Sequence, residues 1–213
     1  MQNVDEDDLY AAMDWLLARQ ARIEDRLARR HLGDGELVLY DVSCSYFEGR
    51  SCPLARLGYS REGKRGTLQI TYGLMCDRTG RPIAVEVFSE QVHDSQTLGS
   101  QIGKLKDRFA LKRVVVVCDR GMVSAANIQL LTDTDGAEWI TALKAPAIKQ
   151  LAAQKILQPS LFDEQNLAEI TAPADYPGER LVVCRDPLVA AQRSRKREDL
   201  LAATERGLHE ISA

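Results

Sequence analysis

The sequence predicts an α/β fold built on a mixed sheet, and three observations support this class. Apolar runs at residues 37–40 and 114–117 each lead into an aspartate, Asp41 and Asp119, as core strands do when they end near a ligand. Between them, a pair of alternating apolar and polar runs flanks a turn, which is typical of a β-hairpin. Apolar residues at helical spacing lie on either side of the second run, as in sheets covered by helices.

Residues 5–31 are predicted to form one amphipathic helix. Apolar side chains recur at helical spacing, acids fill the first turn, and bases fill the last turn, as the helix dipole favours. The apolar residues are Leu9, Met13, Leu16, Ile23 and Leu27. A Gly-Asp-Gly sequence at residues 33–35 then ends the helix. We expect this helix to pack on the following domain or on an upstream part of the protein.

Three strands are expected after the helix. The first covers residues 37–46, and a long connection rich in glycine and positive charge follows it at residues 48–66. Residues 67–75 alternate with period two and form the second strand, and a turn at residues 77–81 leads to the third strand at residues 82–88.

Helices and strands alternate in the next part of the chain. A helix is expected at residues 95–109, with Asp94 as a candidate N-cap. Four consecutive valines at residues 114–117 predict a strand buried on both faces. A helix at residues 124–132 and a short strand at residues 138–143 follow.

The C-terminal third is less regular. A helix is expected at residues 147–157, and residues 158–178 carry three prolines, which indicates a peripheral segment. A strand at residues 179–184 and a long helix at residues 187–211, basic in its middle, complete the sequence.

The order strand, strand, strand, helix, strand, helix, strand is that of the RNase H-like fold. In that fold the first strand is central and the strand after the first helix lies beside it, so Asp41 and Asp119 are expected to meet. We divide the chain into an N-terminal helix (1–35), an RNase H-like catalytic core (36–145) and a partial insertion region (146–213).

Composition and charge narrow the class of protein. The net charge is −3, and no apolar stretch approaches the ~20 residues that a membrane helix needs. With no basic and apolar signal region at the N-terminus, we expect a cytoplasmic protein without a membrane partner. The five cysteines form no C-x-x-C pair, so a structural zinc is not expected, and Cys76 and Cys118 are interpreted as buried reduced thiols.

Basic residues form three clusters, which makes a nucleic-acid backbone a credible partner, although each cluster taken alone could be solvated surface. The clusters are Arg56, Arg61, Lys64 and Arg65; Lys104, Lys106, Arg108, Lys112 and Arg113; and Arg193, Arg195, Lys196 and Arg197.

The expected pair of aspartates suits a divalent cation. Adjacent carboxylates repel each other and stay ionised most easily around Mg²⁺ or Mn²⁺. Two such ions about 3.5–4 Å apart activate a water or a 3′-hydroxyl for in-line attack on a phosphodiester. An aspartate at a strand end can also serve a turn or a cap. A phosphatase-like hydrolase with Asp41 as nucleophile would want a second aspartate where Ser43 stands.

Several motifs resemble bacterial insertion-sequence DDE transposases of the IS-four-like group. They are Leu-Tyr-Asp-Val-Ser-Cys-Ser-Tyr-Phe-Glu-Gly at residues 39–49, Gly-Tyr-Ser-Arg-Glu-Gly-Lys at 58–64, Tyr-Gly-Leu at 72–74 and Cys-Asp-Arg-Gly-Met at 118–122. The resemblance implies that Asp41 and Asp119 are the first two members of a D-D-E triad. It also implies an enzyme that uses Mg²⁺ or Mn²⁺ to nick element ends and join the freed 3′-hydroxyl to target DNA.

The third member of that triad is missing from its expected motif, Tyr-x-x-Arg-x-x-x-Glu-x-x-x-x-x-x-Lys, since no tyrosine is followed three residues later by arginine. Glu198 and Glu205 have neighbours that do not match, so we interpret them as solvated helix residues. We therefore expect a C-terminally truncated transposase.

Two functions stay open at this point. One is a DDE transposase fragment that is inactive alone, and the other is a non-catalytic protein that binds DNA or full-length transposase and interferes with it. Expected partners are double-stranded DNA of element ends and target, and a second copy or a full-length transposase. Lys64, Arg65 and Arg120 are the candidate DNA contacts, although Arg120 could instead orient Asp119 through an ion pair.

Overall fold

The structure is a computed structural model of the chain and describes residues 5–58, 63–64, 66–88, 92–122, 124–162, 165–171 and 175–212. Two compact units divide the chain, Met1–Lys144 and Ala145–Ala213, and each is described by itself. No helix of the described residues is long and apolar enough to cross a membrane.

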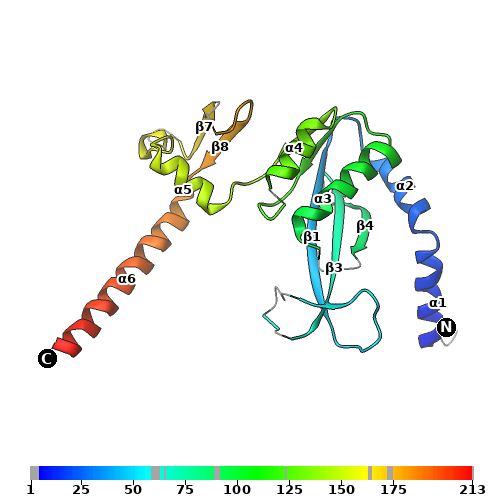
Figure 1. Cartoon of the computed structure of the whole chain (residues 1–213), viewed down its shortest axis with the longest axis horizontal. Helices are drawn as coiled ribbons and strands as arrows, with labels where there is room; N and C mark the ends of the chain where they lie inside the picture. The colour runs from blue at the N-terminus through cyan, green and yellow to red at the C-terminus, as the bar shows by residue number, and fades with distance from the viewer. Residues whose placement is uncertain are drawn as a thin grey trace. The chain divides into compact units, whose positions relative to one another are not determined.

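The first unit is built on a six-stranded sheet around β1 (Figure 1). β1 pairs antiparallel with β3 on one side and parallel with β5 on the other, and β5 continues the sheet in parallel to β6. β4 and the two-residue β2 both pair antiparallel with the far edge of β3. The strands are β1 (Leu37–Phe47), β2 (Arg56–Leu57), β3 (Leu68–Asp77), β4 (Pro82–Phe88), β5 (Val114–Val117) and β6 (Ala137–Ile140). This order and mixed pairing confirm the expected RNase H-like arrangement with β1 at the centre.

The pairing register assigns residues to two faces of the sheet. Tyr40 pairs with Met75 and Val42 with Gly73, whereas Asp41, between them on β1, pairs with Leu74. Since successive side chains of a strand point to opposite sides, Tyr40 and Val42 lie on one face and Asp41 on the other. We call the first the covered face and the second the open face.

The covered face holds the core. Its strand residues pack against helices α2 (Gln20–His31), α3 (Asp94–Gly103) and α4 (Ala125–Asp133) and against a π-helical turn, η1 (Lys104–Arg108). The core side chains from the sheet are Val38, Tyr40, Val42, Met75, Ile83, Ala84, Val114 and Val116, and those from the helices are Ala28, Leu98, Ile102, Leu105 and Leu131.

The open face is much less protected from water. Leu74, Val85 and Val87 are 38%, 39% and 47% exposed. The prediction that β5 is buried on both faces is wrong: Val114 and Val116 are 1% exposed, but Val115 and Val117 are only partly buried. The physical reason is that the described helices of this unit contribute their core residues to the covered face alone.

The single N-terminal helix that the sequence predicts is in fact two helices, α1 (Glu6–Leu17) and α2, separated by a turn at Ala18 and Arg19. α2 is fastened to β4 from its first residue. Gln20 Nε2 donates to the Val85 carbonyl at 2.8 Å, and the Val85 N–H donates to Glu24 Oε1 at 3.2 Å. These bonds fix the direction of α2 but not that of α1.

α1 makes no contribution to the core. Asp5 and Asp8 form a reciprocal capping box at its start, which stabilises the helix locally. Leu9, Met13 and Leu16, which we expected to pack on the domain, are 60%, 64% and 54% exposed. The expected packing therefore holds for α2 and fails for α1.

Most other helix and strand boundaries lie within a few residues of those predicted from the sequence. α3 begins one residue earlier than expected, so His93 is its N-cap and Asp94 its first helical residue. α4 starts after Ser124, whose side chain accepts a hydrogen bond from the Asn127 N–H. β6 ends at Ile140, three residues before the predicted end.

The second unit has its own small sheet. It contains α5 (Ala145–Ala153), a short 3₁₀ turn (Pro159–Phe162), β7 (Leu167–Thr171), β8 (Arg180–Cys184) and α6 (Pro187–Ser212). The predicted strand is β8, but it pairs antiparallel with β7 rather than joining the main sheet. β7 lies in the proline-containing segment at residues 158–178, for which the sequence predicted no strand. The long C-terminal helix is confirmed as α6.

Candidate metal centre

Asp41 and Asp119 come from the two central strands, β1 and the end of β5. Leu37 pairs with Val115 and Leu39 with Val117 in parallel register, and one further step of two residues along each strand leads to Asp41 and Asp119. Residues two apart on a strand share a face. The pairing of the strands therefore directs Asp41 to the open face, beside the point where β5 ends and Asp119 begins the next loop.

Both carboxylates line one cavity of about 500 Å³. Its walls come from β1, β3 and β5 and carry mostly apolar or weakly polar side chains. They are Leu39, Tyr40, Ser43, Tyr72, Leu74, Cys76, Val117 and Cys118, with Gly80. Asp41 and Asp119 are themselves exposed, so a cation could reach them from solvent.

One oxygen of each aspartate is held by the local backbone. Asp41 Oδ1 accepts from the Val42 N–H at 2.9 Å, and Asp119 Oδ1 accepts from the Gly121 N–H at 2.7 Å. The Thr141 hydroxyl donates to the Asp119 carbonyl at 3.2 Å and ties this loop to the segment after β6. Within the described part of the chain, the second oxygen of each carboxylate has no hydrogen-bond partner.

A third carboxylate, Asp94, approaches the same loop from α3. A Cβ on Gly121 would lie 2.9 Å from Asp119 Oδ1 and 3.0 Å from Asp94 Oδ2. The sequence assigned Asp94 a capping role only, because nothing in the chain pattern shows that the start of α3 faces the loop after β5. The sequence offered one signal for Asp94: it is an acidic residue in the first turn of the first helix after the hairpin.

Tyr40 lies on β1, on the covered face of the sheet, with its hydroxyl beside Gly73. It is 3% exposed, and its hydroxyl makes no hydrogen bond to any residue that the structure describes. Burial raises the pKa of Tyr40 to about 12. The neighbouring Thr97 hydroxyl opposes this rise, and the negative charges of Glu86, Asp94 and Asp41 add to it. The Tyr40 hydroxyl is thus a buried donor close to the candidate carboxylates.

The two cysteines next to the cavity are free but not fully buried. Cys76 and Cys118 have intermediate exposure, so they are half-buried thiols rather than the buried ones expected from the sequence. Burial is the main cause that raises the pKa of each thiol, which keeps both protonated at neutral pH.

The structure describes two of the three candidate DNA contacts, Lys64 and Arg120. The Lys64 ammonium lies 3.4 Å from the centre of the Tyr46 ring and 3.8 Å from Glu48 Oε1. Arg65 lies outside the described residues. Arg120 is exposed directly after Asp119 and forms no ion pair with any described acid, Asp119 included.

The second basic cluster is used inside the protein. Its cations contact acids or carbonyl oxygens of the same unit: Lys104 with Glu86 (2.9 Å), Lys106 with the carbonyls of Lys112 and Asp135, Arg108 with Glu24 (2.7 Å) and Asp25 (2.9 Å), and Arg113 with Glu138 (3.2 Å). These residues hold α2, α3 and the strand ends together, so the cluster is mainly structural.

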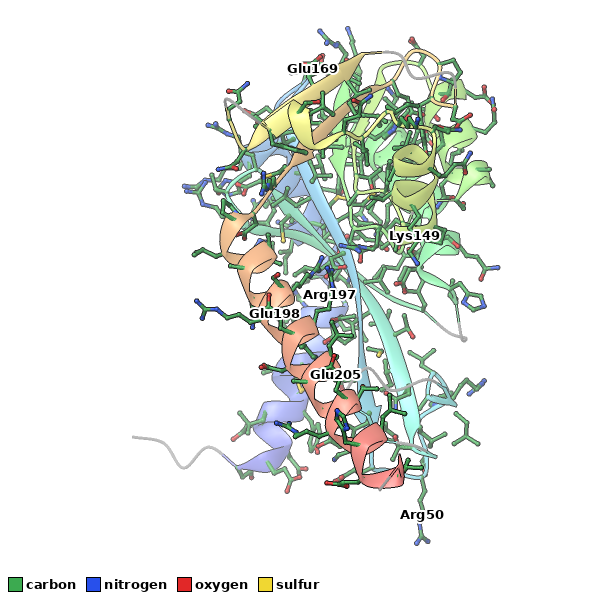
Figure 2. The ribbon with its side chains drawn as sticks, turned by 90° about the vertical axis from the view of Figure 1, so that its left-hand side faces the viewer. Arg50, Lys149, Glu169, Arg197, Glu198 and Glu205 are labelled. Atoms are coloured by element: carbon green, nitrogen blue, oxygen red, sulfur yellow. The ribbon has the colours of Figure 1, made fainter. Side chains whose placement is uncertain are left out.

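Glu198 and Glu205 lie on α6 in the second unit, where both are exposed, as is their neighbour Arg197 (Figure 2). Among the residues that the structure describes, no group of three or more histidines, cysteines, aspartates or glutamates is arranged to hold a metal ion. Asp41 and Asp119 nevertheless offer oxygen ligands only, which is the chemistry that Mg²⁺ and Mn²⁺ prefer. The residues present thus fit the cation in the type of ligand they offer.

Solved structures with a similar fold include transposases. A piggyBac transposase synaptic complex with hairpin DNA matches with a TM-score of 0.43 and 17% identity, over 72% of this chain and 34% of that one. A Mos1 transposase paired-end complex matches with a TM-score of 0.35 and 13% identity, over 64% of this chain and 54% of that one. The Mos1 strand transfer complex matches with a TM-score of 0.36 and 16% identity, over 65% and 46%. This chain thus spans about half of these proteins or less.

No curated protein matches the chain at a significant level. The family described as Transposase DDE domain matches residues 36–198, which include every strand of the main sheet and both central aspartates. The match covers well over half of the sequence. The chain therefore belongs to the Transposase DDE domain family.

Proposed function

We propose that the chain is the catalytic core of an insertion-sequence transposase of the IS-four-like group, acting on double-stranded DNA with Mg²⁺ or Mn²⁺. One observation carries this proposal. Two strands whose aspartates are 78 positions apart in sequence (Asp41 and Asp119) bring both carboxylates to a single cavity at the open face. Family membership supplies the reaction class, cleavage of element ends and transfer of a 3′-hydroxyl to target DNA.

Each residue of the site has a part in this chemistry. Asp41 and Asp119 would hold the cation, and the Gly121 N–H and the Thr141 hydroxyl fix the Asp119 loop. When bound, the divalent cation supplies charge stabilisation for in-line attack on a phosphodiester. Arg120, exposed beside Asp119, and Lys64, on the loop between β2 and β3, would contact the DNA backbone. Arg65, which lies outside the described residues, stays a candidate for the same role. The proposal keeps a cytoplasmic location, where the DNA of a bacterial cell lies, and a second copy of the protein as partner.

The alternative is a non-catalytic protein that binds DNA or a full-length transposase and interferes with it. One observation favours this second candidate: the described residues contain no complete three-carboxylate set. With two ligands of the triad, cation binding would be weaker and strand transfer slower, while binding to DNA would persist.

A nicking assay separates the two functions. The full chain is incubated with DNA carrying the ends of its own element, with Mg²⁺, with Mn²⁺ or with a chelator. A transposase core nicks in a cation-dependent way, and Asp119→Asn lowers the rate at least roughly a hundredfold, as expected for a group that acts directly at the reacting phosphate. Asp14→Asn, a matched change on exposed α1, leaves the rate unchanged.

If cleavage survives in Asp119→Asn, Asp119 is not a ligand of the catalytic cation. DNA retention without any nicking, equal in the wild type and in both variants, would favour the binding protein, and that retention should fall steeply with salt.

A further inference from the structure

α1 presents an apolar stripe that no described residue of its own unit covers. Its members recur at three- and four-residue spacing, so they lie on one face of the helix. They are Leu9, Tyr10, Met13, Leu16 and Leu17, and each is more than half exposed. No residue of α1 is buried.

A helix of this kind normally depends on packing. α1 has 12 residues, a length that is marginal for a helix alone in water, and the packing of an apolar face is what usually stabilises it. The start of α2 does not supply the missing cover, because Gln20 and Glu24 are bonded to Val85 and direct α2 to the sheet. The stripe therefore suits a partner that brings a second apolar helix face.

The stripe is symmetric about Met13. Leu9 and Leu17 stand four positions before and after it, and Tyr10 and Leu16 stand three positions before and after it. Two copies of α1 that cross antiparallel at Met13 would thus set Leu9 against Leu17 and Tyr10 against Leu16. Such self-complementarity is what a two-fold interface requires, since residue i contacts residue j and j contacts i.

The charges at the two ends of α1 favour the same arrangement. The acids Glu6, Asp7 and Asp8 form its first turn, Arg19 and Arg22 follow its last turn, and all five are exposed. An antiparallel pair brings the acidic end of one copy to the basic end of the other, whereas a parallel pair would set acid against acid. Arg19 stacks on the Trp15 ring at 4.1 Å, and neither Glu6 nor Arg19 forms an ion pair with any described residue.

We propose that α1 is a dimerisation element, which pairs antiparallel with α1 of a second copy of this chain about a two-fold axis at Met13. The inference rests on the proposed function only for the expectation of a second copy, because the surface itself follows from α1. One short helix from each copy makes a small interface, so the association is weak.

Sedimentation of the full chain over a concentration series measures the dimer, and the series extends to about 200 μM because small interfaces are weak. Leu9→Lys should raise the dissociation constant at least roughly a hundredfold, since both copies lose a leucine that the dimer buries. Leu200→Lys is the matched control. Leu200 lies on α6 and is 60% exposed, as Leu9 is, and its replacement should leave the dissociation constant unchanged.

A charge exchange tests the antiparallel direction. Glu6→Lys and Arg19→Glu each place like charges together at both ends of the pair, so each should weaken the dimer roughly tenfold. An equimolar mixture of these two variants restores opposite charges at both ends. The mixture should therefore dimerise more tightly than either variant alone.

The remaining outcomes overturn the inference. A chain that stays monomeric throughout the series has no such interface, and if it still nicks DNA, the proposed function stands. A loss of dimer in Leu200→Lys equal to that in Leu9→Lys would assign the partner of the stripe to α6. An unchanged dimer in Leu9→Lys would mean that the copies meet elsewhere, and no gain on mixing would exclude the antiparallel pair. A dimer that responds as expected but does not nick DNA would leave the interface standing without the chemistry.

Discussion

The two faces of the central sheet differ in what covers them and in what they carry. On the covered face, Met75, Val114 and Val116 are each 1% exposed and pack against α3 and α4. On the open face, Leu74 and Val87 are 38% and 47% exposed, and Asp41 reaches solvent. Both faces are built from the same strands, since the side chains of each strand alternate between them.

The comparison shows how one strand serves stability and chemistry at once. Tyr40 and Val42 of β1 fill the core, and Asp41 between them lines the cavity on the other side. Burial on one face gives the strand a fixed register, and the fixed register places the carboxylate. The candidate site thus depends on packing that it does not itself touch.

The largest effect we expect comes from neighbours on β3 that face opposite ways. Met75→Ala removes a side chain that is 1% exposed and leaves a cavity, which should lower the free energy of unfolding by about 2–5 kcal/mol. Leu74→Ala, where the side chain is 38% exposed, should cost about 1 kcal/mol. Urea unfolding of the two variants measures the difference. Equal losses would mean that the open face is covered in solution.

Gly73, between β1 and β4 on the covered face, gives a smaller effect. A Cβ there would clash with the ring and the hydroxyl of Tyr40, so Gly73→Ala should destabilise the protein by about 1–3 kcal/mol. Tyr40→Phe removes a buried hydroxyl without a partner in the described chain, so it should be neutral or stabilising. The double variant should recover part of the loss, as thermal or urea unfolding will show; no recovery would place the clash elsewhere.

The strand ends provide a matched pair of arginines for DNA binding. Arg120 is exposed beside Asp119, whereas Arg113, at the other end of β5, pairs with Glu138 at 3.2 Å. Arg120→Gln should weaken binding to a duplex and reduce the slope of log affinity against log salt by about 1. Arg113→Gln should change neither, because its charge is already paired. Fluorescence anisotropy over a salt series measures both, and equal slopes would remove Arg120 from the DNA surface.

The strands were predictable from the sequence because their patterns are local. The four valines of β5, the alternation of β3 and β4 and the turn between them are each contained in about ten residues. That Asp41 and Asp119 line one cavity could also be inferred, since the strand order brings the ends of β1 and β5 together. These are properties of pattern and topology rather than of individual contacts.

Features that depend on contacts between distant residues could not be predicted. The break between α1 and α2 reflects bonds from Gln20 and Glu24 to Val85, about sixty residues away. The half-exposure of Val117 depends on which face the helices cover. The approach of Asp94 to Gly121 and Asp119 depends on Asn127, which joins the first turn of α3 to the loop after β5. Nothing in the local sequence of Asn127 indicates that role.

The smallest effect we expect concerns Asp77 of β3. It also ends a strand, but Oδ1 of its carboxylate accepts from the N–H and hydroxyl of Thr79 and from the Arg81 N–H. The Thr79 hydroxyl is the largest cause that lowers the pKa of Asp77, from 3.8 to about 2. Because the folded pKa is below the unfolded one, the stabilisation is complete above pH 3.8 and is lost as the pH falls toward 2.

Asp77→Asn should therefore lower stability at neutral pH and remove this part of the acid dependence, measured by urea unfolding between pH 2 and about pH 5. Mn²⁺ affinity should not change, because the Asp77 charge serves a turn, whereas Asp41 and Asp119 each keep one oxygen free of protein partners in the described chain. A fall in Mn²⁺ affinity as large as that of Asp119→Asn would erase the distinction between strand-end aspartates that close turns and those that face the cavity.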